Sequence, residues 1–140
     1  MKSQIIQRET KLIADELIQK FILGDKKVLK YINSFYSYEN IKMQSENKSK
    51  SFSNEQREVL VKSIKNQYSK IDISEQTSKN ISSLLDSKTF CITTGHQLNL
   101  FTGPLMVILK IAQVISISKK LNSEIKNFNY VPVLWIAGED

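Results

Sequence analysis

The chain has 140 residues, of which 41% are hydrophobic and 24% charged, and its formal net charge is +6. These values are ordinary for a globular domain, so the composition excludes a disordered or fibrous protein. A run of about 18 apolar residues is absent, and the first nine residues contain no apolar signal region, so we expect neither a membrane partner nor secretion.

Helical periodicity dominates the first 86 residues. A stripe of Ile13, Leu17 and Phe21 predicts a helix over residues 11–23, with Gly24 as its C-terminal cap. Asp25 is expected to cap a second helix, and the apolar stripe of that helix comprises Val28, Leu29, Ile32, Phe35 and Tyr36. Residues 37–53 are polar and irregular, which predicts a loop.

Two further helices are predicted before residue 86. Ser53 and Gln56 have the spacing of a capping box, so a helix should begin there, with an apolar face of Leu60, Ile64, Tyr68 and Ile71. Ser74 is expected to begin a shorter helix that carries Ile81, Leu84 and Leu85.

The pattern changes near residue 86. The β-branched and aromatic residues 89–94 predict a strand that ends at Gly95. Gly103-Pro104 should open a helix that runs to about Leu121, and this helix is apolar almost all round, so we expect it to be buried. Residues 131–136 are nearly all apolar, as in a strand buried on both faces, with Pro132 near its start or at an unpaired position.

Strand, helix and strand make a βαβ unit, whose strands should be parallel. We therefore predict an α/β fold, in which a mainly helical region over residues 1–86 precedes the first βαβ unit over residues 87–140. Two parallel strands and one helix cannot cover both faces of a sheet, so the sequence is expected to be truncated and marginally folded by itself.

Ligands of parallel sheets bind outside the carboxyl ends of the strands. Thr94-Gly95-His96-Gln97 ends the first predicted strand and Gly138-Glu139-Asp140 the second, so both polar groups should lie at one edge. Glu139 and Asp140 either face solvent or bind cationic groups, and the helix start at Gly103 either attracts a carboxylate or phosphate or binds nothing. The chain has no P-loop and no dinucleotide-binding glycine motif.

The chain has a single histidine and a single cysteine. His96 could be a general base, a hydrogen-bonding residue, or a residue satisfied within its own loop. Other metal ligands are missing around it, so we expect no metal site. Cys91 excludes an internal disulfide and indicates a reducing cytoplasm. Its place inside a strand predicts a buried, inert thiol.

Two segments carry a resemblance to a known family. The first is Thr93-Thr94-Gly95-His96-Gln97-Leu98-Asn99-Leu100-Phe101-Thr102-Gly103-Pro104-Leu105, followed by Lys110, and the second is Val131-Pro132-Val133-Leu134-Trp135-Ile136-Ala137-Gly138-Glu139-Asp140. They resemble the bacillithiol biosynthesis cysteine-adding enzymes (cysteine ligase BshC). That family has a Thr-Gly-(Gln/His)-Gln loop, a Thr-Gly-Pro-Leu helix start, and a Val-Pro-Val-x-Trp strand before Glu-Asp-His-Asp. This sequence ends at the first Asp of that run, and residues 1–85 agree with the family only in their helical character.

The resemblance implies a Rossmann-like core, truncated here, and a ligase that adds cysteine to glucosaminyl-malate in the last step of bacillithiol biosynthesis. By position it implies catalytic roles for His96, Glu139 and Asp140. The substrate-binding roles that it implies fall on Thr94, Gly95, Gln97, Asn99, Thr102 and Gly103.

The resemblance also implies partners. These are the small molecules cysteine and glucosaminyl-malate, and a second copy of the chain held through a coiled coil that lies outside this sequence. Amide formation needs an activated carboxyl group, so ATP or ADP is a natural expectation, although the cofactor stays unknown without a nucleotide motif. The 140-residue fragment alone is expected to be inactive.

Two other functions fit the residues alone. One is another Rossmann-like, nucleotide-using transferase, in which the His96 loop would contact phosphates. The other is a non-catalytic RNA- or partner-binding helical module, because residues 1–70 carry 14 Lys and Arg against 8 Asp and Glu. These lysines are scattered among Ser, Asn and Gln, which is more typical of solvated helix faces, so we expect no nucleic-acid partner.

Overall fold

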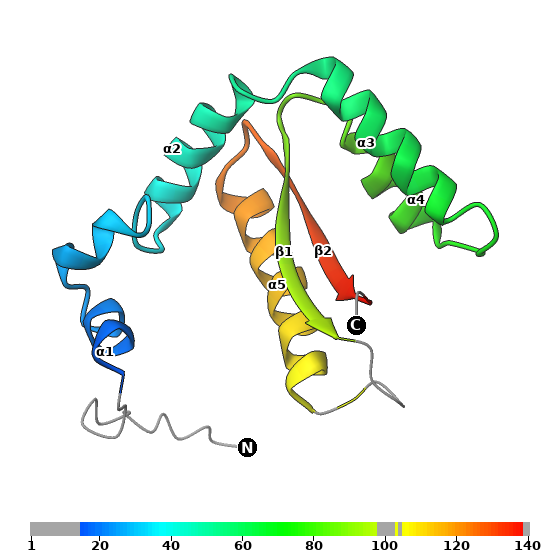
Figure 1. Ribbon diagram of the computed structural model, residues 1–140. Coiled ribbons are helices and arrows are strands. Elements are labelled where there is room, and N and C mark those ends of the chain that lie inside the picture. The colour runs from blue at the N-terminus through cyan, green and yellow to red at the C-terminus, as the bar shows by residue number, and fades with distance from the viewer. Residues whose placement is uncertain (1–14, 98–102, 104, 139–140) are drawn as a thin grey trace. The chain divides into compact units, whose positions relative to one another are not determined.

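The computed structural model describes residues 15–97, 103 and 105–138 (Figure 1). Contacts divide the described chain into two compact units, one ending at Asn40 and the other beginning at Ile41. Helices come first, and a parallel strand–helix–strand unit follows, so the predicted α/β class is confirmed. In the described ranges, every helix is too short or too polar to cross a membrane.

The first helix begins later than its apolar stripe predicts. Asp15 has extended backbone angles (φ −80°, ψ 116°), and its carboxylate accepts the backbone N–H groups of Leu17 and Ile18. Asp15 is therefore the N-cap, and α1 spans Glu16–Ile22. The predicted start at residues 11–14 lies outside the described residues.

The second predicted helix is reduced to a single short turn. Asp25 does act as an N-cap, since its carboxylate accepts the N–H of Lys27 at 2.9 Å. The element that follows is a 3-10 helix, η2 (Lys26–Lys30). Prediction of a longer helix through Tyr36 was wrong, because only Val28 of its stripe is buried, while Tyr36 is 64% exposed.

The polarity of residues 37–53 predicts a loop, and this prediction was wrong. Helix α2 spans Tyr38–Ser49. Its buried residue is Ser45, whose hydroxyl donates to the carbonyl oxygen of Ile41 at 2.9 Å. The residue of α2 that faces the core is therefore polar. For this reason the sequence shows no apolar stripe that would have predicted the helix.

Helices α3 (Asn54–Gln67) and α4 (Glu75–Ser83) begin where the capping signals predict. Ser53 and Gln56 form the reciprocal capping box, and the Ser74 hydroxyl caps α4. Both helices pack on the sheet through a buried cluster made of Val61, Ile81, Leu84 and Val131.

The sheet has two parallel strands, β1 (Thr89–Gln97) and β2 (Asn129–Ala137). Helix α5 (Leu105–Glu124) connects them, which confirms the predicted βαβ unit. The pairing runs without interruption from the first residue of each strand to the last. β1 continues through Gly95 instead of ending there, because Gly95 pairs with Trp135 in the ladder.

Helices cover both faces of the sheet (Figure 1). Val131 packs with α3 and α4, whereas its neighbour Tyr130 points to the other face, because successive strand residues alternate. The Tyr130 ring is buried there and its hydroxyl meets Ser45 of α2. On this face the Asn122 side chain of α5 accepts the N–H of Tyr130 at 2.7 Å and donates to its carbonyl at 2.9 Å.

Pro132 lies within the paired strand, but its backbone nitrogen occupies a position that forms no hydrogen bond to β1, as predicted. The backbone N–H of Asn129 donates to Lys88, on the β1 side, while the backbone groups of Tyr130 go to Asn122. Backbone groups of a parallel strand alternate between its two edges, so Pro132 points the same way as Tyr130. The missing N–H of the proline therefore removes no bond to β1.

Helix α5 is not buried all round, contrary to its apolar composition. Val114, Ser118 and Leu121 face the core. The opposite side is open: Leu105 is 68% exposed and Leu109 58%. One side of the helix already covers the narrow two-stranded sheet, so the remaining apolar residues have no described surface to pack on.

Candidate functional site

The predicted site lies where the two parallel strands end. In the register of the sheet His96 pairs with Ile136 and Gln97 with Ala137. Both arrowheads in Figure 1 therefore end at the same edge. Gly138 follows directly and is the last described residue of the second motif.

Not every predicted site residue can be placed. Asn99, Thr102, Glu139 and Asp140 lie outside the described residues. Gly103 has φ +67°, a left-handed conformation that favours glycine at the turn into α5. The sequence predicts the remaining site residues at the end of a strand and in the loop after it. In the structure they all belong to β1: Thr94, Gly95, His96 and Gln97.

His96 is held by the backbone of the next residue. Its Nδ1 lies 3.0 Å from the carbonyl oxygen of Gln97. A carbonyl can only accept, so Nδ1 carries the hydrogen in this arrangement. In the neutral ring Nε2 then holds the lone pair, and this is the form of imidazole that can take up a proton.

Lys110 is a further candidate for this site. Its ammonium group donates to the carbonyl oxygen of Gly95 at 3.3 Å, so α5 places a positive charge at the end of β1. The family resemblance includes Lys110, but the sequence analysis predicts no role for it. The sequence does mark Lys110 as unusual, because it is the one charged residue in the apolar run of residues 105–112.

Gly95 allows β1 and β2 to approach each other closely at this edge. A methyl group added to Gly95 would lie 3.5 Å from the carbonyl oxygen of Trp135 and 3.7 Å from its Cβ. These are ordinary contact distances, so alanine fits while a longer side chain would meet Trp135. Together the strand ends present an imidazole, an amide and an ammonium group, which can bind an anionic substrate and accept a proton.

Within the described ranges, His, Cys, Asp and Glu side chains nowhere gather in a group of three that could hold a metal ion. The titratable groups that the structure does place at the strand ends are His96 and Lys110, which lie on β1 and α5.

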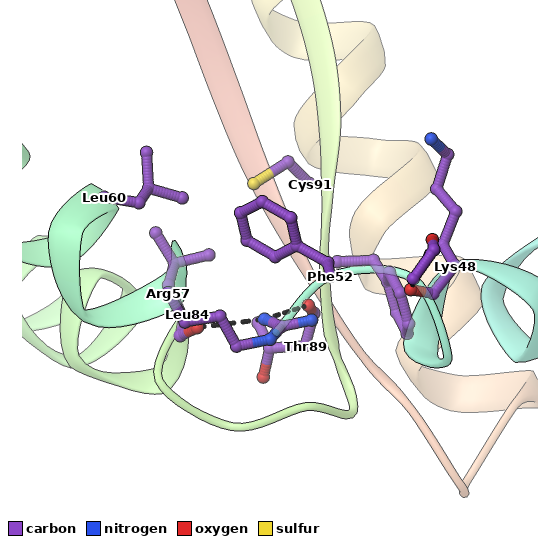
Figure 2. A pocket seen from close by; sticks show the side chains of 9 residues that line it. Lys48, Phe52, Arg57, Leu60, Leu84, Thr89 and Cys91 are labelled. Atoms are coloured by element: carbon purple, nitrogen blue, oxygen red, sulfur yellow. Dashed lines mark hydrogen bonds between the residues drawn. The ribbon is translucent and has the colours of Figure 1, made fainter. Parts of the chain in front are cut away.

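A different polar cluster surrounds the start of β1, and no pattern in the sequence predicts it. Arg57 of α3 is only 3% exposed. Its Nη1 donates to the carbonyl oxygens of Leu84 at 3.0 Å and Thr89 at 3.1 Å, and its Nη2 donates to that of Ser87 at 3.3 Å. Figure 2 shows the guanidinium between Leu84 and Thr89. Arg57 thus ties α3 to the end of α4 and to β1.

Cys91 lies beside this cluster, and the prediction of a buried thiol was wrong. The side chain is exposed, although Cys91 pairs with Val131 and therefore lies on the same face of the sheet as the hydrophobic cluster. Surrounding protein atoms still desolvate the sulfur and raise the pKa of the Cys91 thiol, while the nearby charge of Arg57 opposes that effect. The neutral thiol is therefore favoured near pH 7.

Comparisons with known proteins bear on the whole chain. A family model described as "Bacillithiol biosynthesis BshC, N-terminal Rossmann-like domain" matches residues 1–140. A relative from Flavobacterium psychrophilum, named "Putative cysteine ligase BshC", is 46% identical over 94% of this chain and 24% of its own length. Relatives of the same name from Flavobacterium johnsoniae and Staphylococcus saprophyticus are 40% and 39% identical, over 100% and 90% of this chain. The chain spans about a quarter of the length of these relatives, 26% and 22% for the latter two.

Proposed function

The chain belongs to the family of the N-terminal Rossmann-like domain of the bacillithiol biosynthesis protein BshC, and on this premise we propose that it is the N-terminal part of a cysteine ligase. The reaction would join the carboxyl group of cysteine to the amine of glucosaminyl-malate. The alternatives of another nucleotide-using transferase and of an RNA-binding module have no support from the named relatives.

One observation supports a ligase site at the strand ends more than any other. The parallel register sets His96 and Gln97 beside the end of β2, directly before Gly138, and Lys110 reaches the same place from α5. Polar groups from two separate elements, β1 and α5, meet at the edge where parallel sheets bind their ligands.

The proposed amide-forming reaction needs two kinds of group at this edge, one that binds carboxylates and one that accepts a proton. The malyl part of the substrate carries two carboxylates, which suit Lys110 and the free N–H groups at the start of α5. The attacking amine must lose a proton, and His96, Glu139 or Asp140 could accept it. Gln97 would orient the substrate between these groups.

The carboxyl group of cysteine must be activated before an amine can displace its oxygen. We infer a nucleotide such as ATP as the co-substrate, although the sequence contains neither of the common nucleotide motifs. The part of the relatives beyond the length of this chain is the natural place for such a site and for the proposed dimer contact. A cytoplasmic location fits a biosynthetic ligase and is proposed with it.

The test is a reconstituted assay with the full-length protein. Glucosaminyl-malate, cysteine and ATP are combined, and bacillithiol is measured as its fluorescent thiol adduct. We expect product only when all three are present and none from residues 1–140 alone. A full-length, folded protein that makes no product, but binds RNA with a steep salt dependence, would favour the helical binding module instead.

A further inference from the structure

Arg57 carries a buried positive charge that no carboxylate neutralises among the described residues. Its relative exposure is 3%, and its hydrogen bonds go to three neutral carbonyl oxygens. Buried charges in proteins are normally paired with an opposite charge, because removal from water is costly. The three carbonyls explain how Arg57 joins α3, α4 and β1, but they leave its charge uncompensated.

Two N–H donors of the Arg57 guanidinium have no acceptor among the described residues. A guanidinium has five N–H donors, and the two on Nη1 are taken by Leu84 and Thr89. One on Nη2 goes to Ser87, and Nε has no partner. The Nε–H and one N–H of Nη2 therefore have no acceptor among the described residues, and N–H groups of a guanidinium bind the oxygens of a carboxylate or phosphate.

A pocket of about 190 Å³ adjoins this arginine, and its lining contains two cationic side chains and no carboxylate (Figure 2). Lys48 is the second cation, and neither Lys48 nor Arg57 forms an ion pair with any described residue. None of the nine lining residues is Asp or Glu: they are Lys48, Ser51, Phe52, Arg57, Leu60, Leu84, Thr89, Phe90 and Cys91.

One wall of the pocket shields the guanidinium from water. The Phe52 ring lies against it, with the guanidinium carbon 5.2 Å from the ring centroid. Such an apolar wall lowers the local dielectric constant and strengthens the attraction of the arginine for an anion. Phe52 is 38% exposed, so this wall of the pocket is partly in contact with solvent.

We propose that this pocket binds the oxyanion group, a carboxylate or phosphate, of a small molecule at Arg57, with Lys48 as a second cation of the lining. The site is separate from the proposed ligase site, because it lies at the start of β1, where Thr89 and Cys91 are, and the ligase site lies at the end. The proposal does not depend on the ligase activity and can hold or fail without it.

Cys91 lines the pocket and reports on its occupancy. Full-length protein is treated with N-ethylmaleimide at constant ionic strength, and labelling of the Cys91 peptide is followed by mass spectrometry. Inorganic phosphate and acetate are the two probes, and chloride is the reference anion. We expect at least one probe to slow Cys91 labelling in a saturable manner, and the more protective of the two identifies the preferred oxyanion.

Two substitutions test the assignment of the cations. Lys48→Gln should weaken the binding of the protecting anion about two- to fivefold, which is the effect of losing one exposed ion pair. Lys88→Gln is the matched control, because Lys88 is exposed near the same strand but does not line the pocket, and it should leave protection unchanged. Arg57→Lys keeps the charge but loses the Nε–H donor, so protection should weaken more than about tenfold.

The Lys48 arm stays decisive even if Arg57→Lys does not fold. Labelling that is insensitive to both probes would overturn the proposal. Equal effects of Lys48→Gln and Lys88→Gln would also overturn it, because general charge attraction would then explain any protection.

Discussion

The hydroxyl oxygen of Ser45 lies 3.0 Å from that of Tyr130, and this hydrogen bond joins α2 to β2 across 85 residues of sequence. Ser45 already donates its single hydrogen to the carbonyl oxygen of Ile41. Tyr130 must therefore be the donor and Ser45 the acceptor. Since Tyr130 is only 2% exposed, water cannot replace this bond, and the serine satisfies a hydroxyl that would otherwise be buried without a partner.

Removing either hydroxyl should destabilise the fold by a measurable amount. Tyr130→Phe and Ser45→Ala are each expected to lower the free energy of unfolding by about 1 kcal/mol, the net value of a typical buried hydrogen bond. The double variant should lose less than the sum, because both changes remove the same bond. Urea unfolding of the four proteins gives the coupling energy.

Ser49→Ala is the matched control for that cycle. Its hydroxyl donates within α2, to the carbonyl oxygen of Glu46, so it should show no coupling to Tyr130→Phe. Strict additivity of Ser45→Ala and Tyr130→Phe would mean that the two hydroxyls do not interact in solution.

Stability should also depend on the ionisation of Tyr130. Burial raises the pKa of the Tyr130 phenol above its usual value of 10.0, so the unfolded chain loses this proton at a lower pH than the folded chain does. The contribution of Tyr130 is fully present below pH 10.0 and falls as the pH rises from there through the folded-state pKa. Urea unfolding at several values of alkaline pH should show a steeper loss for the wild type than for Tyr130→Phe. Parallel losses in the two proteins would contradict this assignment.

Helix α2 shows why part of the fold escaped prediction from sequence. Patterns of apolar residues predicted α3, α4, α5 and both strands, because each of these elements packs through an apolar face. α2 instead presents Ser45 to the core, and the partner that makes a serine acceptable there is 85 residues away. No local pattern can reveal a polar contact of that separation.

The candidate site could be predicted to a similar degree. Parallel pairing places the ends of β1 and β2 at one edge by topology alone, so His96 and Gln97 followed from strand assignment. Arg57 and Cys91 did not, because their environment depends on how α3 and α4 meet the sheet. An arginine in a solvent-facing helical pattern looks like a surface residue until its three carbonyl acceptors are known.

Arg57 should be among the most sensitive positions of the helical layer. Arg57→Met removes three hydrogen bonds from a charged donor, and the carbonyl oxygens of Leu84, Ser87 and Thr89 lose that donor. We expect the free energy of unfolding to fall by about 3 kcal/mol, which is less than the sum of three separate bonds because the bonds share one donor group. Lys65→Met, an exposed position of the same helix, should change stability by less than about 0.5 kcal/mol in the same urea titration. Equal losses in the two variants would show that Arg57 is an ordinary surface residue.

Cys91 should react slowly with thiol reagents near neutral pH. Desolvation raises the pKa of its thiol above the ordinary 9.0, so the reactive thiolate forms only at higher pH. The labelling rate of the Cys91 peptide should therefore still be rising above pH 9.0. A rate that levels off well below that pH would mean that the charge of Arg57 outweighs desolvation.

The same cysteine is not expected to take part in the proposed reaction, since the thiol of the product comes from the cysteine substrate. Cys91→Ala in the full-length protein should leave turnover within a few-fold of wild type. A loss of activity in a folded Cys91→Ala protein would place this strand face in the catalytic machinery.

The end of β1 should be sensitive to changes that remove function but spare the fold. Gln97 is exposed, and the Lys110 ammonium group donates to the exposed carbonyl oxygen of Gly95, so neither side chain belongs to the buried core. Gln97→Ala and Lys110→Gln in the full-length protein, and Asp140→Asn beside them, should each lower bacillithiol formation by about tenfold or more, as loss of a positioning or charge-stabilising group does. Melting temperatures should stay close to wild type.

The kinetic constants separate the roles of these residues. Lys110→Gln should mainly raise the KM for glucosaminyl-malate, because the lysine is proposed to bind its carboxylates in the ground state as well as the transition state. Asp140→Asn should mainly lower kcat if the carboxylate accepts the proton of the attacking amine. Lys119→Gln is the matched control, since it removes the same charge from an exposed position of α5 nine residues further along the helix. If Lys110→Gln and Gln97→Ala both behave like this control, the ligase site does not lie at the end of β1, and the polar groups that meet there serve only the packing of the strands.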